Sequence, residues 1–189
     1  MSIGPGIVRD TQRAIRMMAE TLVGPIVLAA TDKGVIWLEI RAEGDHHPAH
    51  NFQTGESAAA RIADRAVAEL GLYFRGELRD FSVSFCLDGL SEFQRRVLEH
   101  LVHIPFGQVE TYGEVALKIG KANSARAVGG ALARNPIAIM IPCHRVVAYD
   151  GQLHGFLSPE GIHTKAKLLR HEGIAVRDGC VKLDEQSEV

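Results

Sequence analysis

The sequence predicts an α+β protein, with a small N-terminal α/β domain over residues 1–88, a mostly helical C-terminal domain over 89–176 and an acidic tail over 177–189. Two observations support this division. Runs of β-forming residues separated by turn residues continue up to Phe85, whereas helix-capping patterns follow one another from Ser91 onward. The chain has 189 residues, of which 46% are hydrophobic, so it can bury one large core or two small ones.

The N-terminal domain is predicted from a hairpin and a helix. Residues 25–30 and 35–40 are β-rich runs joined by a turn that contains Asp and Gly. The run 15–19 fits a helix and a strand equally well. Residues 57–74 repeat apolar side chains at helical spacing, which predicts an amphipathic helix packed on the hairpin. Residues 81–85 alternate apolar and polar side chains, which predicts a further strand of the same sheet.

Composition argues against membrane, disulfide and metal classes. No apolar run approaches the roughly 20 residues of a membrane span, and the start of the chain does not resemble a signal peptide, so we expect a cytoplasmic protein. Cys86, Cys143 and Cys180 lack the spacing of a disulfide framework or a zinc site, which fits a reducing compartment. Residues 44–50 hold three histidines but no flanking cysteine or acid at ligand spacing on a regular element, so we expect a solvated loop and no metal.

The C-terminal domain is predicted to contain three helices. Ser91 begins a capping-box pattern and a helix that runs to about residue 103, and Thr111 begins a second one through 119. Ser124 is predicted to cap a third helix over 125–133. The glycine-containing turn between the second and third helices favours a helix-turn-helix, although such pairs also occur in plain helical cores. Residues 89–173 hold 10 basic and 7 acidic side chains, a small cationic excess that is consistent with a bound polyanion and also with chance.

The third predicted helix has an unusual composition. Arg126 and Ala127 precede Gly129 and Gly130, and each glycine inside a helix costs about 1 kcal/mol relative to alanine. Close approach of this helix to a DNA groove or to another helix would offset that cost. Arg126 is then either a solvated surface residue or a side chain inserted into DNA.

A cysteine follows the apolar run 137–141, which we interpret as a short buried strand. Cys143 stands beside His144 and Arg145, and a thiolate next to a base is a good nucleophile. On an extended segment, neighbouring side chains point to opposite sides, so His144 can hardly bond the adjacent sulfur directly. A buried free cysteine is also a common core residue, and this spacing alone leaves both explanations open.

Five motifs occur in order along the second half of the chain: Thr111-Tyr112-Gly113, Arg126-Ala127-Val128-Gly129, Asn135-Pro136, Ile141-Pro142-Cys143-His144-Arg145-Val146 and Leu168-Leu169-Arg170-His171-Glu172-Gly173. Together they resemble the O6-alkylguanine-DNA alkyltransferases, the methylated-DNA protein-cysteine methyltransferases. The resemblance implies a ribonuclease H-like N-terminal domain followed by a winged helix-turn-helix-like domain. It also implies direct-reversal DNA repair, in which O6-alkylguanine, or less readily O4-alkylthymine, in duplex DNA transfers its alkyl group once and irreversibly, without a cofactor.

The resemblance assigns the catalytic residues. Cys143 would be the nucleophile and alkyl acceptor, His144 would take its proton through a water, and Glu172 would orient the imidazole. Tyr112 would donate a hydrogen bond to the guanine N3 as the base departs. Asn135 would tie the third helix to the active-site segment.

The same resemblance assigns the DNA contacts and the substrate pocket. Helix 124–133 would enter the minor groove, where Arg126 fills the space of the flipped base. The other DNA-binding residues would be Ala127, Gly129, Gly130, Thr111 and Ser124. The pocket would be lined by Val146, Arg145, Phe156 as an aromatic wall and Ser158 beside the leaving oxygen. The loop 149–161 looks shorter than in the family, which affects the size of the pocket.

Three alternatives remain at this stage. An alkyltransferase-like lesion-binding protein would share the fold but typically carries tryptophan at the cysteine position. A cysteine hydrolase would require an oxyanion hole, for which no motif is present. A transcriptional regulator would carry base-reading polar side chains, which residues 127–133 lack. We expect a monomer that binds double-stranded DNA and no membrane, with cooperative binding left open.

Overall fold

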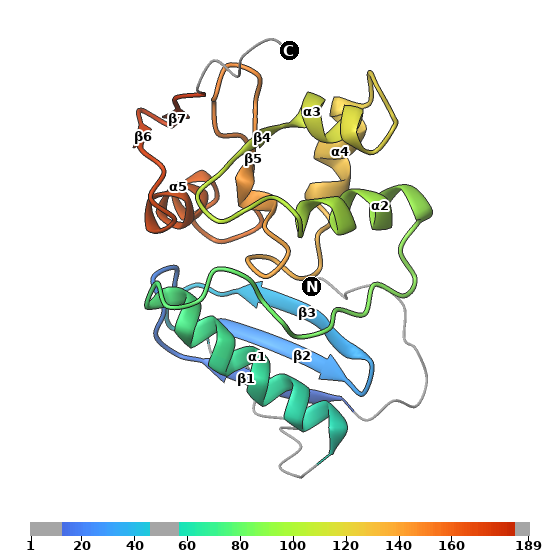
Figure 1. The fold of residues 1–189 in the computed structure, drawn as a ribbon. Coiled ribbons are helices and arrows are strands. Elements are labelled where there is room, and N and C mark those ends of the chain that lie inside the picture. Colours follow the sequence, from blue (N-terminus) through green and yellow to red (C-terminus); the bar gives the residue numbers. More distant parts are fainter. Residues whose placement is uncertain (1–12, 46–56, 184–189) are drawn as a thin grey trace.

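The computed structural model describes residues 13–45 and 57–183, which form two parts stacked one on the other (Figure 1). The N-terminal part contains β1 (Ala14–Met18), β2 (Ile26–Thr31), β3 (Gly34–Ile40) and α1 (Ala58–Phe74). The second part contains α2 (Glu92–Leu101), β4 (Glu110–Thr111), α3 (Tyr112–Lys118), α4 (Ala125–Leu132), the 3-10 turn η1 (Cys143–Arg145), β5 (Val146–Val147), α5 (Ile162–His171), β6 (Val176–Arg177) and β7 (Cys180–Val181). The predicted α+β class is confirmed.

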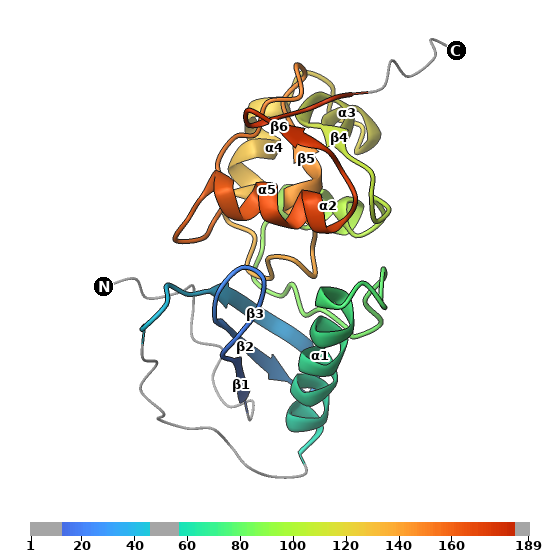
Figure 2. The same cartoon turned by 90° about the vertical axis from the view of Figure 1, so that its left-hand side faces the viewer.

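The N-terminal sheet is antiparallel, in the order β1-β2-β3, and α1 packs across one of its faces (Figure 2). The predicted hairpin is confirmed as β2 and β3, and β2 is buried along its whole length. The ambiguous run 15–19 forms β1, because its backbone pairs with β2 from Ala14 to Met18. The predicted helix is confirmed as α1, whose N-cap Ser57 accepts a hydrogen bond from Ala60 N.

The strand predicted over residues 81–85 does not form, and this prediction is wrong. The segment does return to the edge of the sheet, but it makes only one isolated bridge, between Phe85 and Val35. The reason is the carboxylate of Glu69 on α1, which accepts the backbone N–H groups of Ser82 and Val83 at 2.8 and 3.4 Å. Those donors are therefore engaged by a side chain instead of a neighbouring strand.

The strand predicted over residues 137–141 is also absent. The segment is buried, as expected, but it folds back on itself through the bridge between Ala138 and Ile141, and Ile139 has a φ of 71°. Its start lies along the N-terminal sheet, where Leu38 N on β3 donates to Pro136 O at 2.8 Å. The sheet edge therefore supports the backbone that leads to Cys143.

Helices α2, α3 and α4 pack on one another, with a tight turn between α3 and α4. Thr111 completes a full capping box: its hydroxyl accepts from Glu114 N, and the Glu114 carboxylate accepts from Thr111 N. Ser124 occupies the N-cap position of α4, but its side chain makes no capping hydrogen bond, so that prediction is wrong. Its φ of −102° and ψ of 20° lie outside the extended region that a capping serine adopts.

The end of the described chain packs on the second part. β6 and β7 form an antiparallel pair, and Val181 N donates to Gly151 O at 2.9 Å. The first residues of the predicted acidic tail, 177–183, thus contribute to a small apolar cluster with Val147, Leu153 and Leu169. The rest of the tail, and the loop with three histidines from residue 46, lie outside the described residues. None of the helices in the described ranges has the length and apolar character that crossing a bilayer requires.

Candidate active site and DNA-facing helix

The backbone at Cys143 is a 3-10 turn, in place of the predicted extended segment. Arg145 N donates to Pro142 O at 2.9 Å, and Val146 N donates to Cys143 O. Successive side chains of a 3-10 turn leave the axis about 120° apart, so the Cys143 thiol and the His144 imidazole still diverge. Cys143 is 6% exposed and His144 is fully buried, so both groups are shielded from bulk water.

Glu172, directly after α5, accepts five hydrogen bonds. His144 Nε2 donates to Oε1 at 2.7 Å, and Arg145 donates to both oxygens at 2.8 and 3.0 Å. Tyr73 OH donates to Oε1 at 2.8 Å, and Gly107 N donates to Oε2 at 3.3 Å. Burial would raise the pKa of Glu172, but His144 and Arg145 together hold it below its ordinary value. The buried carboxylate is therefore ionised and fully engaged.

The bond to Glu172 fixes the tautomer of His144. A carboxylate only accepts hydrogen bonds, so Nε2 carries the proton and Nδ1 carries the lone pair. Nδ1 is buried and has no hydrogen-bond partner among the described residues. Burial lowers the pKa of His144 below 6.5, against the opposing effect of Glu172, so the ring is neutral at neutral pH. A neutral imidazole with a free lone pair can accept a proton.

The end of α4 and the active-site turn are joined by Asn135. Its Nδ2 donates to Ile141 O at 2.9 Å, and its Oδ1 accepts from Ile137 N at 3.0 Å. Burial raises the pKa of the Cys143 thiol, while a hydrogen bond from Asn135 and the charge of Lys165 act to lower it. The resting cysteine is therefore protonated, with two groups placed to favour its thiolate.

Tyr112 reaches the site because of a short parallel pairing. β4 pairs with β5, Thr111 lying opposite Val147, so the first residue of α3 stands beside the segment that follows η1. Tyr112 is half-buried, and burial and the nearby Cys143 raise its pKa. The phenol is therefore protonated and able to donate a hydrogen bond.

Lys165 is part of the site, although none of the five sequence motifs contains it. Its Nζ donates to Val146 O at 2.6 Å and to His154 O at 3.2 Å, and it lies 5.9 Å from the centre of the Tyr112 ring. Burial lowers its pKa to about 8, although the nearby Cys143 opposes this effect. The available signal was its place on the apolar face of α5, next to Leu168 and Leu169 one turn later.

The predicted pocket residues differ in where they lie. The Phe156 ring stands edge-on to His144, with centroids 6.5 Å apart, so it does reach the site. The Ser158 hydroxyl donates within its own loop, to Gly161 O at 3.5 Å. Arg145 is predicted to line the substrate pocket, whereas its guanidinium is engaged by Glu172 and by Ile104 O at 2.6 Å. Val146 lies beside Lys165, to which its carbonyl is bonded.

The residues predicted to bind DNA lie mostly on α4. Arg126 and Ala127 are exposed, and Ser124, Gly129 and Gly130 are half-buried. A Cβ built at Gly129 would lie 3.8 Å from the Tyr112 ring, and one at Gly130 would lie 3.9 Å from the Arg134 guanidinium, both ordinary contacts. Packing within the protein therefore does not require either glycine. Thr111 is half-buried, and its hydroxyl caps α3.

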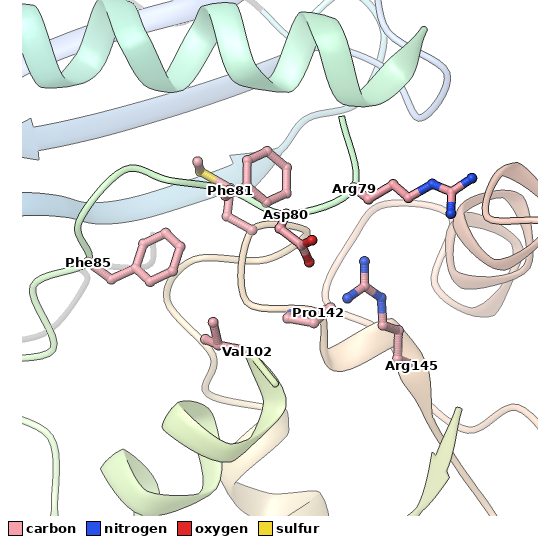
Figure 3. A pocket seen from close by; sticks show the side chains of 8 residues that line it. Arg79, Asp80, Phe81, Phe85, Val102, Pro142 and Arg145 are labelled. Carbon is pink, nitrogen blue, oxygen red and sulfur yellow. The ribbon is translucent and has the colours of Figure 1, made fainter. Parts of the chain in front are cut away.

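A separate pocket lies between the two parts of the molecule, behind the active-site turn (Figure 3). Pro142 and Arg145 border it on one side, and Phe81 and Phe85 border it on the other. Neither Cys143 nor His144 lines this pocket. No group of three or more histidine, cysteine or acidic residues in the described chain is arranged to hold a metal ion.

Comparisons with known proteins find relatives of this chain by sequence and by structure. The sequence model described as 6-O-methylguanine DNA methyltransferase, DNA binding domain, matches residues 92–174. A methylated-DNA–protein-cysteine methyltransferase of Methanosarcina acetivorans is 39% identical over 154 residues, which cover 82% of this chain and 95% of that protein. The protein of the same name from Mycobacterium leprae is 39% identical over 150 residues, covering 79% and 87% of the two chains.

Solved structures extend the match to the fold. The crystal structure of the Mycobacterium tuberculosis O6-methylguanine methyltransferase has a TM-score of 0.70 at 38% identity and covers 85% of this chain and 92% of that one. That of Mycobacterium tuberculosis OGT in complex with DNA has a TM-score of 0.69 at 36% identity, with 84% and 92% covered.

The fold and the site define a class of protein in which a helix-turn-helix part carries a buried cysteine next to a paired histidine and glutamate. Within that class, the similarity of this chain to its relatives over most of its length identifies the family. The chain belongs to the methylated-DNA–protein-cysteine methyltransferases.

Proposed function

We propose that this protein repairs DNA by moving the alkyl group of O6-alkylguanine in duplex DNA onto Cys143, once per molecule. The observation that carries the proposal is the ordered set of Glu172, a neutral His144 with an unpartnered Nδ1, and the adjacent buried thiol. This is the arrangement of nucleophile, base and orienting carboxylate that covalent catalysis requires.

The chemistry follows from the proton positions. His144 Nδ1 takes the thiol proton of Cys143, through a water because the two side chains diverge, and Glu172 stabilises the resulting imidazolium. The thiolate then attacks the alkyl carbon. A carbon–sulfur bond forms as the bond from carbon to O6 breaks, and the electron pair of that bond stays on the guanine. The thiol proton finally neutralises the departing base, so the transfer needs no cofactor and no redox partner.

Two further residues would assist the transfer, Tyr112 at the departing guanine and Lys165 at the thiolate. Tyr112, protonated because its pKa is raised, would donate to N3 of the base as negative charge develops. Lys165 would stabilise the thiolate through its charge, because its ammonium lies close enough to shift the pKa of Cys143. The carbonyls of Cys143 and Val146 each accept one hydrogen bond within the protein, and their second lone pairs would accept from the exocyclic amine of guanine.

The thiol is buried, so the base must leave the duplex to meet it. We propose that α4 enters the minor groove with the exposed Arg126 taking the place of the flipped base, and that Gly129 and Gly130 permit close approach. Thr111 and Ser124, half-buried at the starts of α3 and α4, would contact the backbone of the DNA. Phe156 would form a wall of the alkyl pocket, with Ser158 near the leaving oxygen. Action as a monomer and a cytoplasmic location also belong to this proposal.

The main alternative is a protein that flips the lesion and transfers nothing. The oriented proton acceptor beside Cys143, the His144 imidazole held by Glu172, disfavours this alternative. A sensor that transfers nothing has no need of a proton acceptor beside its thiol. A hydrolase has less support, because the backbone N–H of the Cys143 nucleophile already donates to Ile141 O and is not available to an oxyanion hole.

The test is a mass measurement on the protein. The full chain is mixed with a duplex oligonucleotide that carries one O6-methylguanine, and intact and peptide masses are recorded over time. We expect a stoichiometric gain of one methylene unit on the Cys143 peptide, without turnover. Cys86 and Cys180 are internal controls, since both are more exposed than Cys143 and would react first with a nonspecific reagent. Lesion binding without a mass change would establish the sensor instead, and the absence of both lesion binding and methyl transfer would overturn the DNA-repair function.

A further inference from the structure

The catalytic carboxylate receives a hydrogen bond from the N-terminal part of the molecule. Tyr73 lies near the end of α1, 99 residues before Glu172, and its hydroxyl donates to Glu172 Oε1 at 2.8 Å. Tyr73 is fully buried. Its ring is wedged between aromatic side chains of both parts, with centroid distances of 5.5 Å to Phe81, 6.1 Å to Phe106 and 5.0 Å to His171.

The hydroxyl has a fixed role in this position. Burial and the adjacent Glu172 carboxylate raise the pKa of Tyr73, so it remains a neutral donor at any pH that the folded protein tolerates. Its backbone is fixed as well, because His171 Nε2 donates to Tyr73 O at 2.7 Å. His171 directly precedes Glu172. Two hydrogen bonds therefore join Tyr73 to the end of α5, one from its hydroxyl to Glu172 and one from His171 to its carbonyl.

We propose that Tyr73 is a positioning residue for alkyl transfer, through which the N-terminal part sets the basicity of His144. This inference rests on the proposed function, in which His144 accepts the thiol proton. Glu172 Oε1 accepts from Tyr73, His144 and Arg145 together. Each donor withdraws negative charge from the oxygen that faces the imidazole, so the hydroxyl weakens the attraction of that oxygen for an imidazolium.

Removing the Tyr73 hydroxyl should therefore change the pH at which His144 is protonated, a property that side-chain packing alone does not set. With one donor fewer, Oε1 is more negative and favours the protonated imidazole, so His144 should protonate at a higher pH. The other charged groups that act on His144 are Glu172, which favours its protonation, and Arg145 and Lys165, which oppose it. The exposed Arg79 packs over the Phe106 ring, with its guanidinium carbon 5.6 Å from the ring centre. None of these groups changes in a variant that lacks only the hydroxyl.

The experiment compares Tyr73→Phe with the full-length natural sequence. Two quantities are measured across pH: the single-turnover rate of methyl transfer to Cys143, and the titration of the His144 ring nitrogens by NMR. We expect the acidic limb of both curves to move to higher pH, and the transfer rate above that limb to rise, because a more basic His144 takes the thiol proton more readily. Lesion binding, measured with Cys143→Ser added to each protein, should not change.

Phe74→Leu is the matched structural control. Phe74 touches the Tyr73 ring, with centroids 5.3 Å apart, but bonds to nothing in the catalytic cluster. This variant should lower the thermal midpoint and leave the His144 titration in place. An unshifted titration in Tyr73→Phe would overturn the proposal, and so would an equal shift in Phe74→Leu. The NMR titration does not depend on activity, so a protein that transfers no methyl group would refute the proposed function while the coupling of Tyr73 to His144 was still decided.

Discussion

The active-site turn and helix α4 differ in where their polar and conformational requirements are met. Around η1 the protein itself supplies the partners: Glu172 accepts five hydrogen bonds, and Arg145 donates through three nitrogens to Glu172 and a carbonyl. On α4, Arg126 and Ala127 face outward, and the two glycines adjoin no atom that would exclude a methyl group.

This difference shows which functions can be argued from internal contacts. The bonds around η1 engage Glu172 and Arg145 fully and leave His144 Nδ1 without a partner, and the proposed chemistry rests on that free acceptor. The composition of α4 destabilises an isolated helix and gains nothing inside the fold. An external surface pressed against α4, such as the DNA groove proposed above, would offset that cost.

The largest expected effect is the complete loss of transfer in Cys143→Ser. A serine hydroxyl is far less acidic than a thiol, so His144 cannot generate a nucleophile from it. Binding of lesion-containing duplex should persist, because α4 is unchanged. Peptide mass spectrometry and a gel-shift assay measure the two properties, and Cys86→Ser serves as the control that keeps both. Methylation of the Cys143→Ser protein at any residue would contradict the assignment of the nucleophile.

Glu172→Gln should break the hydrogen-bond network around η1. The change leaves the buried Arg145 without its counter-charge, which typically costs about 3–5 kcal/mol of folding free energy. It also removes the group that orients His144, so the transfer rate should fall by about 10²–10⁴-fold. Chemical denaturation and single-turnover kinetics give the two values.

The matched control for this variant is Glu160→Gln, an acid that is 51% exposed and paired with Lys167 at 2.7 Å. Removing an exposed pair should change the stability by less than about 1 kcal/mol. Equal losses in the two variants would mean that the network around Glu172 contributes no more than a surface ion pair.

The pH dependence tests the same region without a mutation. Because the folded-state pKa of His144 is lowered below 6.5, the ring stays neutral as the pH falls through 6.5. The transfer rate should therefore remain constant through that value and decline only at lower pH, by about tenfold per unit. Folding stability should also decrease below pH 6.5, since the unfolded chain binds the proton first. A rate that halves at pH 6.5 or above would refute a buried neutral base.

Sequence patterns predicted those parts of the molecule that depend on local interactions. The hairpin, α1 and the Thr111 capping box follow from periodicity and capping residues, and the motif around Cys143 indicated the family. The strands over 81–85 and 137–141 fail because their apolar pattern reports burial, whereas strand formation also needs a partner edge. Glu69 captures the backbone of the first, and the second folds on itself at Ile139.

The residues missed at the site are those that meet it through tertiary packing. Lys165 resembles an ordinary helix lysine until α5 docks against β5, and Tyr73 resembles a core aromatic until α1 meets Glu172. The partner of each is defined only when distant segments come together, so the place of Lys165 on the apolar face of α5 indicates burial but not the group it binds. Arg145 is a third case: its place in the motif suggested a substrate contact, while its buried guanidinium is bonded to the catalytic carboxylate.

Arg126→Ala tests helix α4, the second of the two regions compared above. The residue is exposed on α4, so its removal should leave stability unchanged and weaken binding to lesion-containing duplex by about 1–3 kcal/mol. Arg95→Ala, on the exposed side of α2, removes the same charge from the same part of the molecule. Fluorescence anisotropy at fixed salt compares the two. An equal loss in both variants would reduce the role of Arg126 to general electrostatic attraction.

Gly130→Ala gives the smallest effect and the most direct test of the comparison between the two regions. Inside a helix, alanine is favoured over glycine by about 1 kcal/mol, and the new methyl group would meet only the flexible Arg134 side chain. The variant should thus be more stable and yet bind lesion-containing DNA more weakly. Gly71→Ala in α1, where a Cβ would also make ordinary contact, should gain similar stability without losing affinity. If only Gly130→Ala gained stability and lost affinity, the conformational cost of glycine at this position would be offset by contact with DNA and not by packing within the protein. If Gly130→Ala kept full affinity, the groove-facing role of α4 would have to be assigned to another surface.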